Sequence, residues 1–547
     1  MSTGRSRTIR RGLALVVAAL VLAGACTGDP TTSAAPEPSS ATGAVIPAGG
    51  GNPPPPVFSA VTVPPGQIDA AIEQIPGFVE TAMQETGVPG VAVAVVHDGE
   101  IVFAQGFGVR NVDAGDTIDA DTAFQIASLS KSVGATVITR EVGEGTIAWD
   151  DPIVDELSGF ELADPYVTER VSYADLYSHR SGLPPHIGDT LEDLGYDRAE
   201  VLERLRHAPL EPFRAQNLYT NFGITAAGQA AANAAGVTWE ELSAQNLYEP
   251  LGMANTTSSY QEFLARDNRA DLHVQQEGEW QNLNTRDPDA QSPAGGVSSS
   301  VNDLARWMDL ILADGMYEGE QFIDAAALSE MLTPHSPSGA PPRTLASRPG
   351  TDLLGFNSGV TSTARVQFSH SGAFAMGAGT NFQMVPAEKL GIVVLTNGSP
   401  IGVAEAIGSQ FMDLALVGSL TQDWLTAYQS VLTPLLKNDA SLEDVPAPTD
   451  PAPPLADDAY AGTYANDYYG PVEVAAGSGG LVLRIGPDLT EYPLTPRDRN
   501  EFTWVAPGEN SPGPSLVVFT PALGGTGPTM EIVCLNEVEP LGIFTRA

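Results

Sequence analysis

The chain has 547 residues, with 67 Asp and Glu against 26 Lys and Arg and a formal net charge of −41 at pH 7. This charge would repel a phosphate backbone, so we expect no nucleic-acid partner. The hydrophobic fraction of 42% and charged fraction of 17% are typical of globular domains and exclude a protein with many membrane spans. The seven histidines and two cysteines form no H-E-x-x-H or C-x-x-C pair, so we expect neither a metal site nor a cofactor.

Residues 1–26 begin with a basic stretch and continue as a short apolar run that stops at Cys26. The run is too short for a stable membrane-spanning helix, which needs roughly 20 residues, and it predicts a signal peptide. The small residues 23–25 directly before Cys26 resemble a bacterial lipobox, so we expect lipidation of this cysteine and an exported protein at the cell surface or in the periplasm. An ordinary signal peptide and a secreted protein are the alternative.

Residues 27–60 are rich in Pro, Ala, Ser, Thr and Gly, which predicts a disordered tether. The main domain is expected over residues 61–437. It should open with a helix over residues 66–87, kinked at Pro76-Gly77, followed by a hairpin over 90–109. The turn of that hairpin is expected at Asp98-Gly99, because both residue types tolerate positive φ.

A second hairpin is expected over residues 380–397, and a further helical stretch over 403–437. Some 250 residues of mainly helical pattern separate the two hairpins. This arrangement predicts an α/β (α+β) fold, in which helices flank an antiparallel sheet and a helical subdomain is inserted. The active or binding site should lie between the sheet and the inserted subdomain.

The C-terminal part is separated from the main domain by an acidic, proline-rich linker over residues 438–458. Residues 459–547 then hold short β-like runs between Gly and Pro turns, which predict a small β-barrel or sandwich. Within it, Cys534 lies in an apolar run and is expected to be a buried thiol.

Residues 128–131 read S-L-S-K, at the start of a helix expected to begin at or just before Ser128 and to end by Gly143. Positions i and i+3 share one face of a helix, so Ser128 and Lys131 can touch. A serine hydroxyl becomes a strong nucleophile when a neighbouring base takes its proton, and a desolvated lysine can be that base. A polar helix start with a solvated lysine is the alternative.

Two further motifs accompany this pair: Y-x-N at Tyr219 and Asn221, and H-x-G at His370 and Gly372. With them, residues 65–435 resemble serine β-lactamases of class C and the related D-alanyl-D-alanine carboxypeptidases, D-aminopeptidases and esterases. The motifs S-x-x-K, Y-x-N and K/H-x-G occur here in that family's order. Three more segments are similar to the family: D-L-Y-S-H-R-S-G-L-P at 175–184, E-P-L-G-M at 249–253 and P-A-G-G-V-S-S-S-V-N-D-L-A-R-W-M at 293–308.

The resemblance implies that Ser128 attacks a carbonyl carbon and forms an acyl-enzyme, while Lys131 and Tyr219 share the proton transfer. Which of the two is the base stays open at this point. A phenol titrates near pH 10, so Tyr219 could be the base only if cations stabilised its phenolate. Lys131, alone or together with His370, would have to supply that positive charge.

Substrate contacts are also implied by the resemblance. Asn221 would hydrogen-bond the substrate amide, the N–H groups of Ser128 and Ala373 would form the oxyanion hole, and Gly372 would leave room for substrate along its strand. His370 would also belong to the substrate-binding set. Class C β-lactamases have a lysine at this position, whereas histidine is common among the peptidase and esterase relatives.

The function expected from these residues is that of an exported serine hydrolase acting on amides or esters, such as D-amino-acid peptides or cell-wall fragments. Two alternatives remain: a penicillin-recognising binding protein with little turnover, and a carboxylesterase of the same family. The C-terminal domain is similar to the small lipocalin-like domain appended to many such hydrolases, which implies that it shapes or caps the substrate cleft. The expected partners are a small peptide, ester or β-lactam substrate and, through a lipid anchor only, a membrane.

Overall fold

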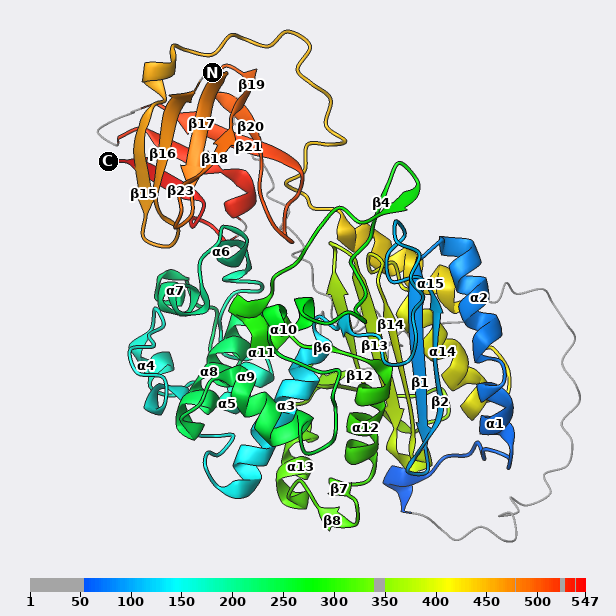
Figure 1. Ribbon diagram of the computed structural model, residues 1–547. Coiled ribbons are helices and arrows are strands. Elements are labelled where there is room, and N and C mark those ends of the chain that lie inside the picture. The colour runs from blue at the N-terminus through cyan, green and yellow to red at the C-terminus, as the bar shows by residue number, and fades with distance from the viewer. Residues whose placement is uncertain (1–53, 339–349, 478, 522–526, 537) are drawn as a thin grey trace, which may run out of the picture.

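The computed structural model describes residues 54–338, 350–477, 479–521, 527–536 and 538–547. The expected signal peptide, its Cys26 and most of the expected tether lie outside these residues. The chain forms an α/β domain with an eight-stranded antiparallel sheet between helices, and a second domain built on a nine-stranded antiparallel sheet (Figure 1). Both parts of the predicted fold class are confirmed.

The eight-stranded sheet has the order β2-β1-β14-β13-β12-β11-β10-β9. Its strands are β1 (Gly90–His97), β2 (Glu100–Gly108), β9 (Ser336–Pro337), β10 (Thr351–Asp352), β11 (Asn357–Val360), β12 (Val366–Phe374), β13 (Ala378–Val385) and β14 (Leu390–Thr396). Asp98 and Gly99 form the first hairpin turn with φ values of 51° and 85°, as expected for a two-residue hairpin loop. Because β1 pairs with β14, the two predicted hairpins lie side by side.

Both faces of this sheet are buried under helices (Figure 1). In β1, alternate residues belong to separate apolar clusters, with Val91, Val93 and Val95 on one face and Ala92, Ala94 and Val96 on the other. The first face packs against α1 (Gln67–Ile72), α2 (Ile75–Thr86), α14 (Val403–Leu416) and α15 (Trp424–Leu432). The second packs against α3 (Leu129–Glu144), α12 (Val301–Leu312) and α13 (Ala325–Met331). Burial on both faces explains the nearly continuous apolar sequence of the central strands.

The remaining helices of the α/β domain form the inserted subdomain beside α3 (Figure 1). They are α4 (Pro165–Thr168), α5 (Tyr173–Tyr177), α6 (Asp189–Asp193), α7 (Arg198–Arg204), α8 (Asn221–Ala235), α9 (Trp239–Ser243), α10 (Tyr260–Leu264) and α11 (Ser292–Gly295). Three short strand pairs lie outside the two large sheets: β3 (Phe124–Gln125) with β6 (Ser298–Ser299), β4 (Val274–Gln276) with β5 (Glu279–Gln281), and β7 (Met316–Tyr317) with β8 (Glu320–Gln321).

The predicted kink in the first helix is wrong in position. The helical segment is divided into α1 and α2 at residues 73–74, and Pro76 lies in the first turn of α2. A proline is tolerated there because the N–H groups of a first helical turn have no partner within the helix. Pro76 therefore helps to start the second helix and does not bend the first.

The C-terminal sheet has the order β18-β17-β16-β15-β23-β22-β21-β20-β19 and is nearly closed. Its strands are β15 (Gly462–Asn466), β16 (Gly470–Gly477), β17 (Gly480–Ile485), β18 (Thr490–Pro493), β19 (Thr495–Asp498), β20 (Glu501–Val505), β21 (Pro514–Thr520), β22 (Thr529–Ile532) and β23 (Ile543–Arg546). Cys534 is buried in this domain, with 4% of its surface exposed.

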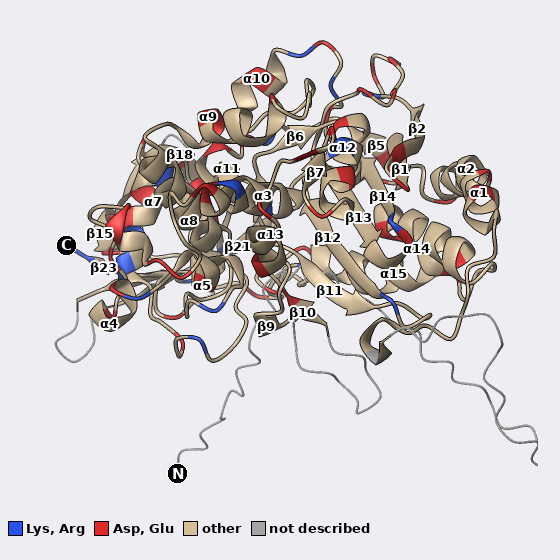
Figure 2. Cartoon of the chain, turned by 90° about the horizontal axis from the view of Figure 1, so that it is seen from below, with Lys and Arg blue, Asp and Glu red and all other residues tan. Residues whose placement is uncertain are grey.

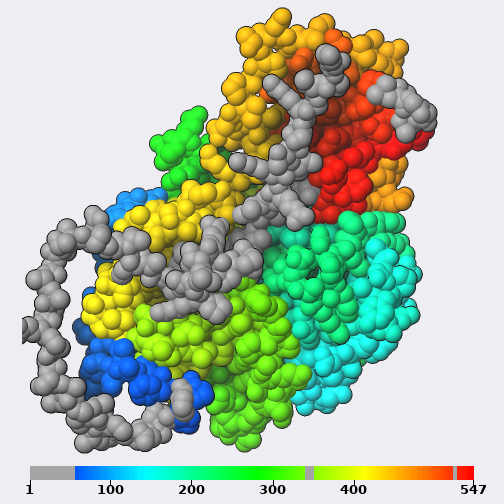
Figure 3. All heavy atoms as spheres, turned by 180° about the vertical axis from the view of Figure 1, so that it is seen from behind, coloured from blue at the N-terminus to red at the C-terminus, as the bar shows by residue number. Residues whose placement is uncertain are grey.

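The C-terminal domain packs directly on the helical subdomain, as the space-filling view also shows (Figure 3). The hydroxyl of Tyr468 accepts a hydrogen bond from the Gly188 N–H at 2.9 Å, and that of Tyr469 bonds Thr190 at 2.8 Å. Tyr196 donates its hydroxyl to the Tyr469 carbonyl at 2.7 Å. These contacts fix the C-terminal domain against helix α6 and the residues beside it.

Acidic side chains are spread over both domains, and basic ones are few (Figure 2). Within the described part of the chain, no helix combines the length and apolar character needed to cross a bilayer.

Candidate active site

Ser128 lies at the N-terminus of α3, next to strand β12 of the large sheet. The preceding residue, Ala127, has φ of 48°, which reverses the backbone just before the helix begins at Leu129. Helix α3 is buried along most of its length. The serine is therefore presented by a tight turn on a helix that the domain core holds in place. Both ends of this helix lie one residue later than predicted: it begins at Leu129, with Ser128 as the residue before its first turn, and ends at Glu144.

Lys131 is completely buried, and its amine has three neighbours within hydrogen-bond distance. Nζ lies 3.0 Å from Ser128 Oγ, 2.8 Å from Asn221 Oδ1 and 2.9 Å from the Ala294 carbonyl oxygen. Burial lowers the pKa of Lys131 to about 7, although the charge of Asp189 acts in the opposite direction. The amine can therefore be neutral near pH 7, which an exposed lysine cannot.

The three neighbours of this amine differ in what they can do. Asn221 Oδ1 and the Ala294 oxygen can only accept, so both take an N–H from the amine. The Ser128 hydroxyl can also donate. A neutral Lys131 would thus direct its lone pair at the Ser128 proton, which is the arrangement that a general base requires.

Tyr219 donates its phenol hydroxyl to Ser128 Oγ at 2.8 Å. Its ring packs against His179, with centroids 4.5 Å apart, and lies 4.8 Å from Lys131 Nζ. Burial raises the pKa of Tyr219 well above its ordinary value, and the negative charges of Asp189 and Asp352 act in the same direction. Tyr219 is therefore a proton donor in this site.

Asn221 is held at both ends of its side-chain amide, since its Nδ2 donates to Asp189 Oδ2 at 2.9 Å while its Oδ1 faces Lys131. Asp189 is buried and also contacts His186 Nδ1 at 3.1 Å. We predicted that Asn221 would hydrogen-bond substrate. That substrate contact stays a prediction; in this structure the amide connects the buried acid Asp189 to the amine.

The surroundings of His370 disfavour a positive charge on its ring. This residue lies on β12 and is buried; burial and the neighbouring Lys131 lower its pKa to about 3. Its Nδ1 lies 2.7 Å from the Ser371 carbonyl oxygen, which can only accept, so Nδ1 carries the proton. His370 is therefore a neutral ring whose Nε2 can accept a hydrogen bond.

The edge of β12 lies open beside Ser128, because β11 pairs with β12 only over Val366–Ser369. A Cβ on Gly372 would lie 2.3 Å from the Ile126 carbonyl oxygen and 3.0 Å from the Ser128 nitrogen. Close packing against the turn that carries Ser128 thus requires this glycine, and its expected role of making room for substrate stays a prediction. Ala373 follows on the same strand, opposite Gly379 of β13.

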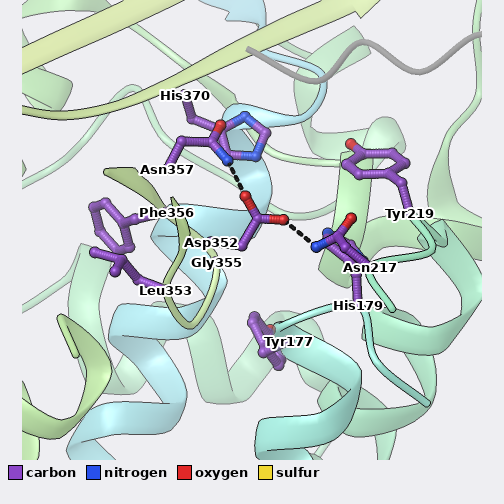
Figure 4. A pocket seen from close by; sticks show the side chains of 10 residues that line it. All are labelled: Tyr177, His179, Asn217, Tyr219, Asp352, Leu353, Gly355, Phe356, Asn357 and His370. Carbon is purple, nitrogen blue, oxygen red and sulfur yellow. Dashed lines mark hydrogen bonds between the residues drawn. The ribbon is translucent and has the colours of Figure 1, made fainter. Parts of the chain in front are cut away.

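A pocket beside Tyr219 and His370 contains residues that the sequence motifs did not predict (Figure 4). Asp352 lies at its centre, between the side-chain amides of Asn217 and Asn357. His179 belongs to the D-L-Y-S-H-R-S-G-L-P segment noted above, but no spacing rule connects it to Tyr219. Asp352 belongs to no motif, because it reaches the pocket only through the pairing of β10 with β11.

Comparison with models of protein families identifies the family of this chain. A β-lactamase family model covers residues 75–416 of the chain, which is more than half of its length. The chain belongs to the β-lactamase family. It is therefore a member of a hydrolase family with a penicillin-binding-like fold. Among its described residues, no group of three or more His, Cys, Asp or Glu side chains could hold a metal ion.

Similar β-lactamase-family proteins occur in distant organisms. "Unguisins hydrolase ungD" of Aspergillus violaceofuscus is 24% identical over 420 residues, covering 71% of this chain and 73% of that protein. Penicillin-binding protein 4 of Amycolatopsis lactamdurans is 28% identical over 259 residues, covering 45% of this chain and 66% of that protein.

Solved structures share the fold. The octameric penicillin-binding protein homologue from Pyrococcus abyssi has a TM-score of 0.54 at 20% identity, covering 87% of this chain and 100% of that chain. The class C β-lactamase from Rhodobacter sphaeroides has a TM-score of 0.51 at 19% identity, covering 64% of this chain and 99% of that chain.

Proposed function

We propose that this β-lactamase-family protein is a serine hydrolase that forms an acyl-enzyme on Ser128. One observation carries the proposal: the buried Lys131 amine has two neighbours that can only accept hydrogen bonds and a third, the Ser128 hydroxyl, that can donate to its lone pair. This arrangement supports Lys131 as the base. The raised pKa of Tyr219 and the neutral His370 argue against a phenolate base.

The reaction then has two stages. Lys131 takes the hydroxyl proton while Ser128 Oγ bonds to the substrate carbonyl carbon, and the bond to the leaving nitrogen or oxygen breaks. Tyr219, whose hydroxyl contacts Ser128 Oγ, donates its proton to the leaving group and recovers a proton from Lys131. Water then hydrolyses the serine ester and restores the free hydroxyl.

Negative charge on the carbonyl oxygen needs hydrogen-bond donors. Ser128 N–H has no hydrogen-bond partner among the described residues, and it lies beside the open edge of β12. We assign it, together with the N–H of Ala373, to the oxyanion hole, where each donor is typically worth about 3 kcal/mol. His370 and Gly372 belong to the strand along which the substrate would lie.

The substrates we propose are amides or esters such as D-amino-acid peptides or cell-wall fragments. Carboxypeptidase, aminopeptidase and esterase activities all fit the proposed chemistry. The neutral His370 offers no permanent cation to the carboxylate of a β-lactam, so we expect inefficient β-lactam hydrolysis.

We also propose that the protein is exported and lipidated at Cys26, on the strength of its N-terminal sequence. Metabolic labelling with an alkyne fatty acid tests this. Label in the full chain that disappears in Cys26→Ala supports lipidation, and equal labelling of both proteins overturns it.

Steady-state turnover tests the enzymatic proposal. Sustained hydrolysis of a p-nitrophenyl ester or a D-alanyl peptide, lost in Ser128→Ala, is the expected result. The likeness to Penicillin-binding protein 4 supports a second candidate, a protein that is acylated without turnover. A single stoichiometric burst, with a persistent acyl mass on Ser128, would favour that candidate.

A further inference from the structure

The pocket beside Tyr219 contains a buried carboxylate that the proposed reaction does not use. Asp352 is only 6% exposed. Its Oδ1 accepts the side-chain amide of Asn357 at 2.7 Å, and its Oδ2 accepts that of Asn217 (Figure 4). Asn217 stands two residues before Tyr219, so Asp352 of β10 is hydrogen-bonded to the segment that carries the phenol.

No cation balances this carboxylate in the described residues. Asp352 makes no ion pair there, and its two hydrogen-bond donors are neutral amides. The pocket lining contains no lysine or arginine. His370, which also lines the pocket, is neutral and presents Nε2 without a proton. Among the described residues, the pocket therefore has no positively charged side chain in its lining, and Asp352 is its one acidic residue.

The proposed role of Tyr219 places the leaving group near this pocket, and this step rests on the proposed function. Tyr219 must touch the leaving atom in order to protonate it. Because Tyr219 and His370 both line the pocket, the group attached to the leaving atom extends toward it, and toward Asp352.

We propose that Asp352 makes this pocket a selectivity site, which rejects leaving groups that carry a carboxylate and accepts neutral or cationic ones. Like charges a few ångströms apart in a poorly solvated pocket repel far more strongly than in water. A peptide cleaved just before its C-terminal residue would bring its carboxylate to Asp352. Internal amide bonds, amidated peptides and neutral esters would not.

Three acetate esters that differ only in the leaving phenol test the proposal. The phenols carry a carboxylate, a carboxamide or an aminomethyl group at the meta position, and each kcat/KM is divided by the rate at which hydroxide hydrolyses the same ester. We expect the carboxamide and aminomethyl esters to exceed the carboxylate ester by about tenfold or more. Equal normalised values for all three overturn the selectivity.

The Asp352→Asn variant then assigns the effect to this residue. It should raise the normalised value of the carboxylate ester about tenfold and bring the three esters together. Asp309→Asn is the matched control, because Asp309 is a half-buried acid on α12 outside the pocket. It should leave the ratios unchanged. Thermal melting checks that both variants fold.

The wild-type protein gives a second measurement that does not depend on the variant. Inhibition by 3-hydroxybenzamide should be about tenfold stronger than inhibition by 3-hydroxybenzoate, and equal inhibition constants would count against Asp352. If none of the esters is hydrolysed and Ser128 is never acylated, the proposed function itself fails. If all three esters react equally, only the selectivity assigned to Asp352 fails.

Discussion

Lys131 Nζ lies 3.0 Å from Ser128 Oγ and is completely buried. The cost of burying a charge lowers the lysine pKa, and the same burial makes it a base near neutral pH. The proposed nucleophile and base thus lie within one helical turn at the start of α3, and the residues packed around Lys131 set its pKa.

The pH dependence of Ser128 acylation should report Lys131. The neutral amine is the base, and its fraction grows as pH rises toward the pKa of about 7. Acylation by a fluorophosphonate should therefore rise about tenfold per pH unit below 7 and level off above it. In Lys131→Met, which keeps the buried stem, the rate should fall about 10³-fold. A wild-type rate that is independent of pH from 5 to 9 would contradict this assignment.

Tyr219→Phe should separate proton donation from nucleophile activation. An amide needs its leaving nitrogen protonated, whereas p-nitrophenolate leaves without a proton. We expect a loss of about 10²-fold in kcat/KM for a D-alanyl amide and less than about tenfold for a p-nitrophenyl ester. Equal losses on both substrates would show that the phenol acts elsewhere in the reaction.

Asp189 should tune the base through its charge. Its carboxylate raises the pKa of Lys131 and accepts the Asn221 amide that orients Oδ1 toward the amine. Asp189→Asn should therefore shift the rise of the acylation profile to lower pH. Asp309→Asn removes a charge that does not contribute to the pKa shift of Lys131, so it should leave the midpoint in place. If the pH midpoint of acylation is unchanged or higher in Asp189→Asn, Asp189 does not raise the pKa of Lys131.

The sequence predicted the side chains that meet at Ser128, and it missed buried acids that lie around them. Ser128 and Lys131 are one helical turn apart, so their contact follows from local geometry. Asp352 reaches the site through a short strand pair, and Asp189 through contacts made by separate segments. The neutral state of His370 depends on burial, which no local pattern encodes.

In the C-terminal domain, too, local sequence patterns predicted some strands and missed those that depend on pairing. The runs that give β17 and β21 are mainly apolar, and they were predicted as short β-like runs between Gly and Pro turns; in the structure their residues are buried alternately. Strands β18 and β19 have mostly exposed, polar sequences, T-E-Y-P and T-P-R-D, and only pairing with their neighbours makes them strands. The packing of this domain on α6 likewise depended on tyrosines with no recognisable motif.

Glu509 should transmit the effect of the C-terminal domain to the substrate cleft. Its carboxylate accepts the N–H groups of Ala375 and Met376, immediately after strand β12, while its own N–H is bound by Asp193 of α6 at 2.8 Å. One side chain thus joins the C-terminal domain to the end of the strand that carries His370.

Glu509→Ala leaves both N–H groups without this acceptor, and the loop after β12 should loosen. We expect kcat/KM for substrates with long acyl groups to change several-fold, with p-nitrophenyl acetate altered by less than about twofold because a small acyl group does not reach the loop. Glu491→Ala is the control, since the ion pair of Glu491 with Arg484 lies at the exposed surface of the same domain. A specificity profile of Glu509→Ala identical to that of the wild type would show that Glu509 holds the C-terminal domain in place without affecting the substrate cleft.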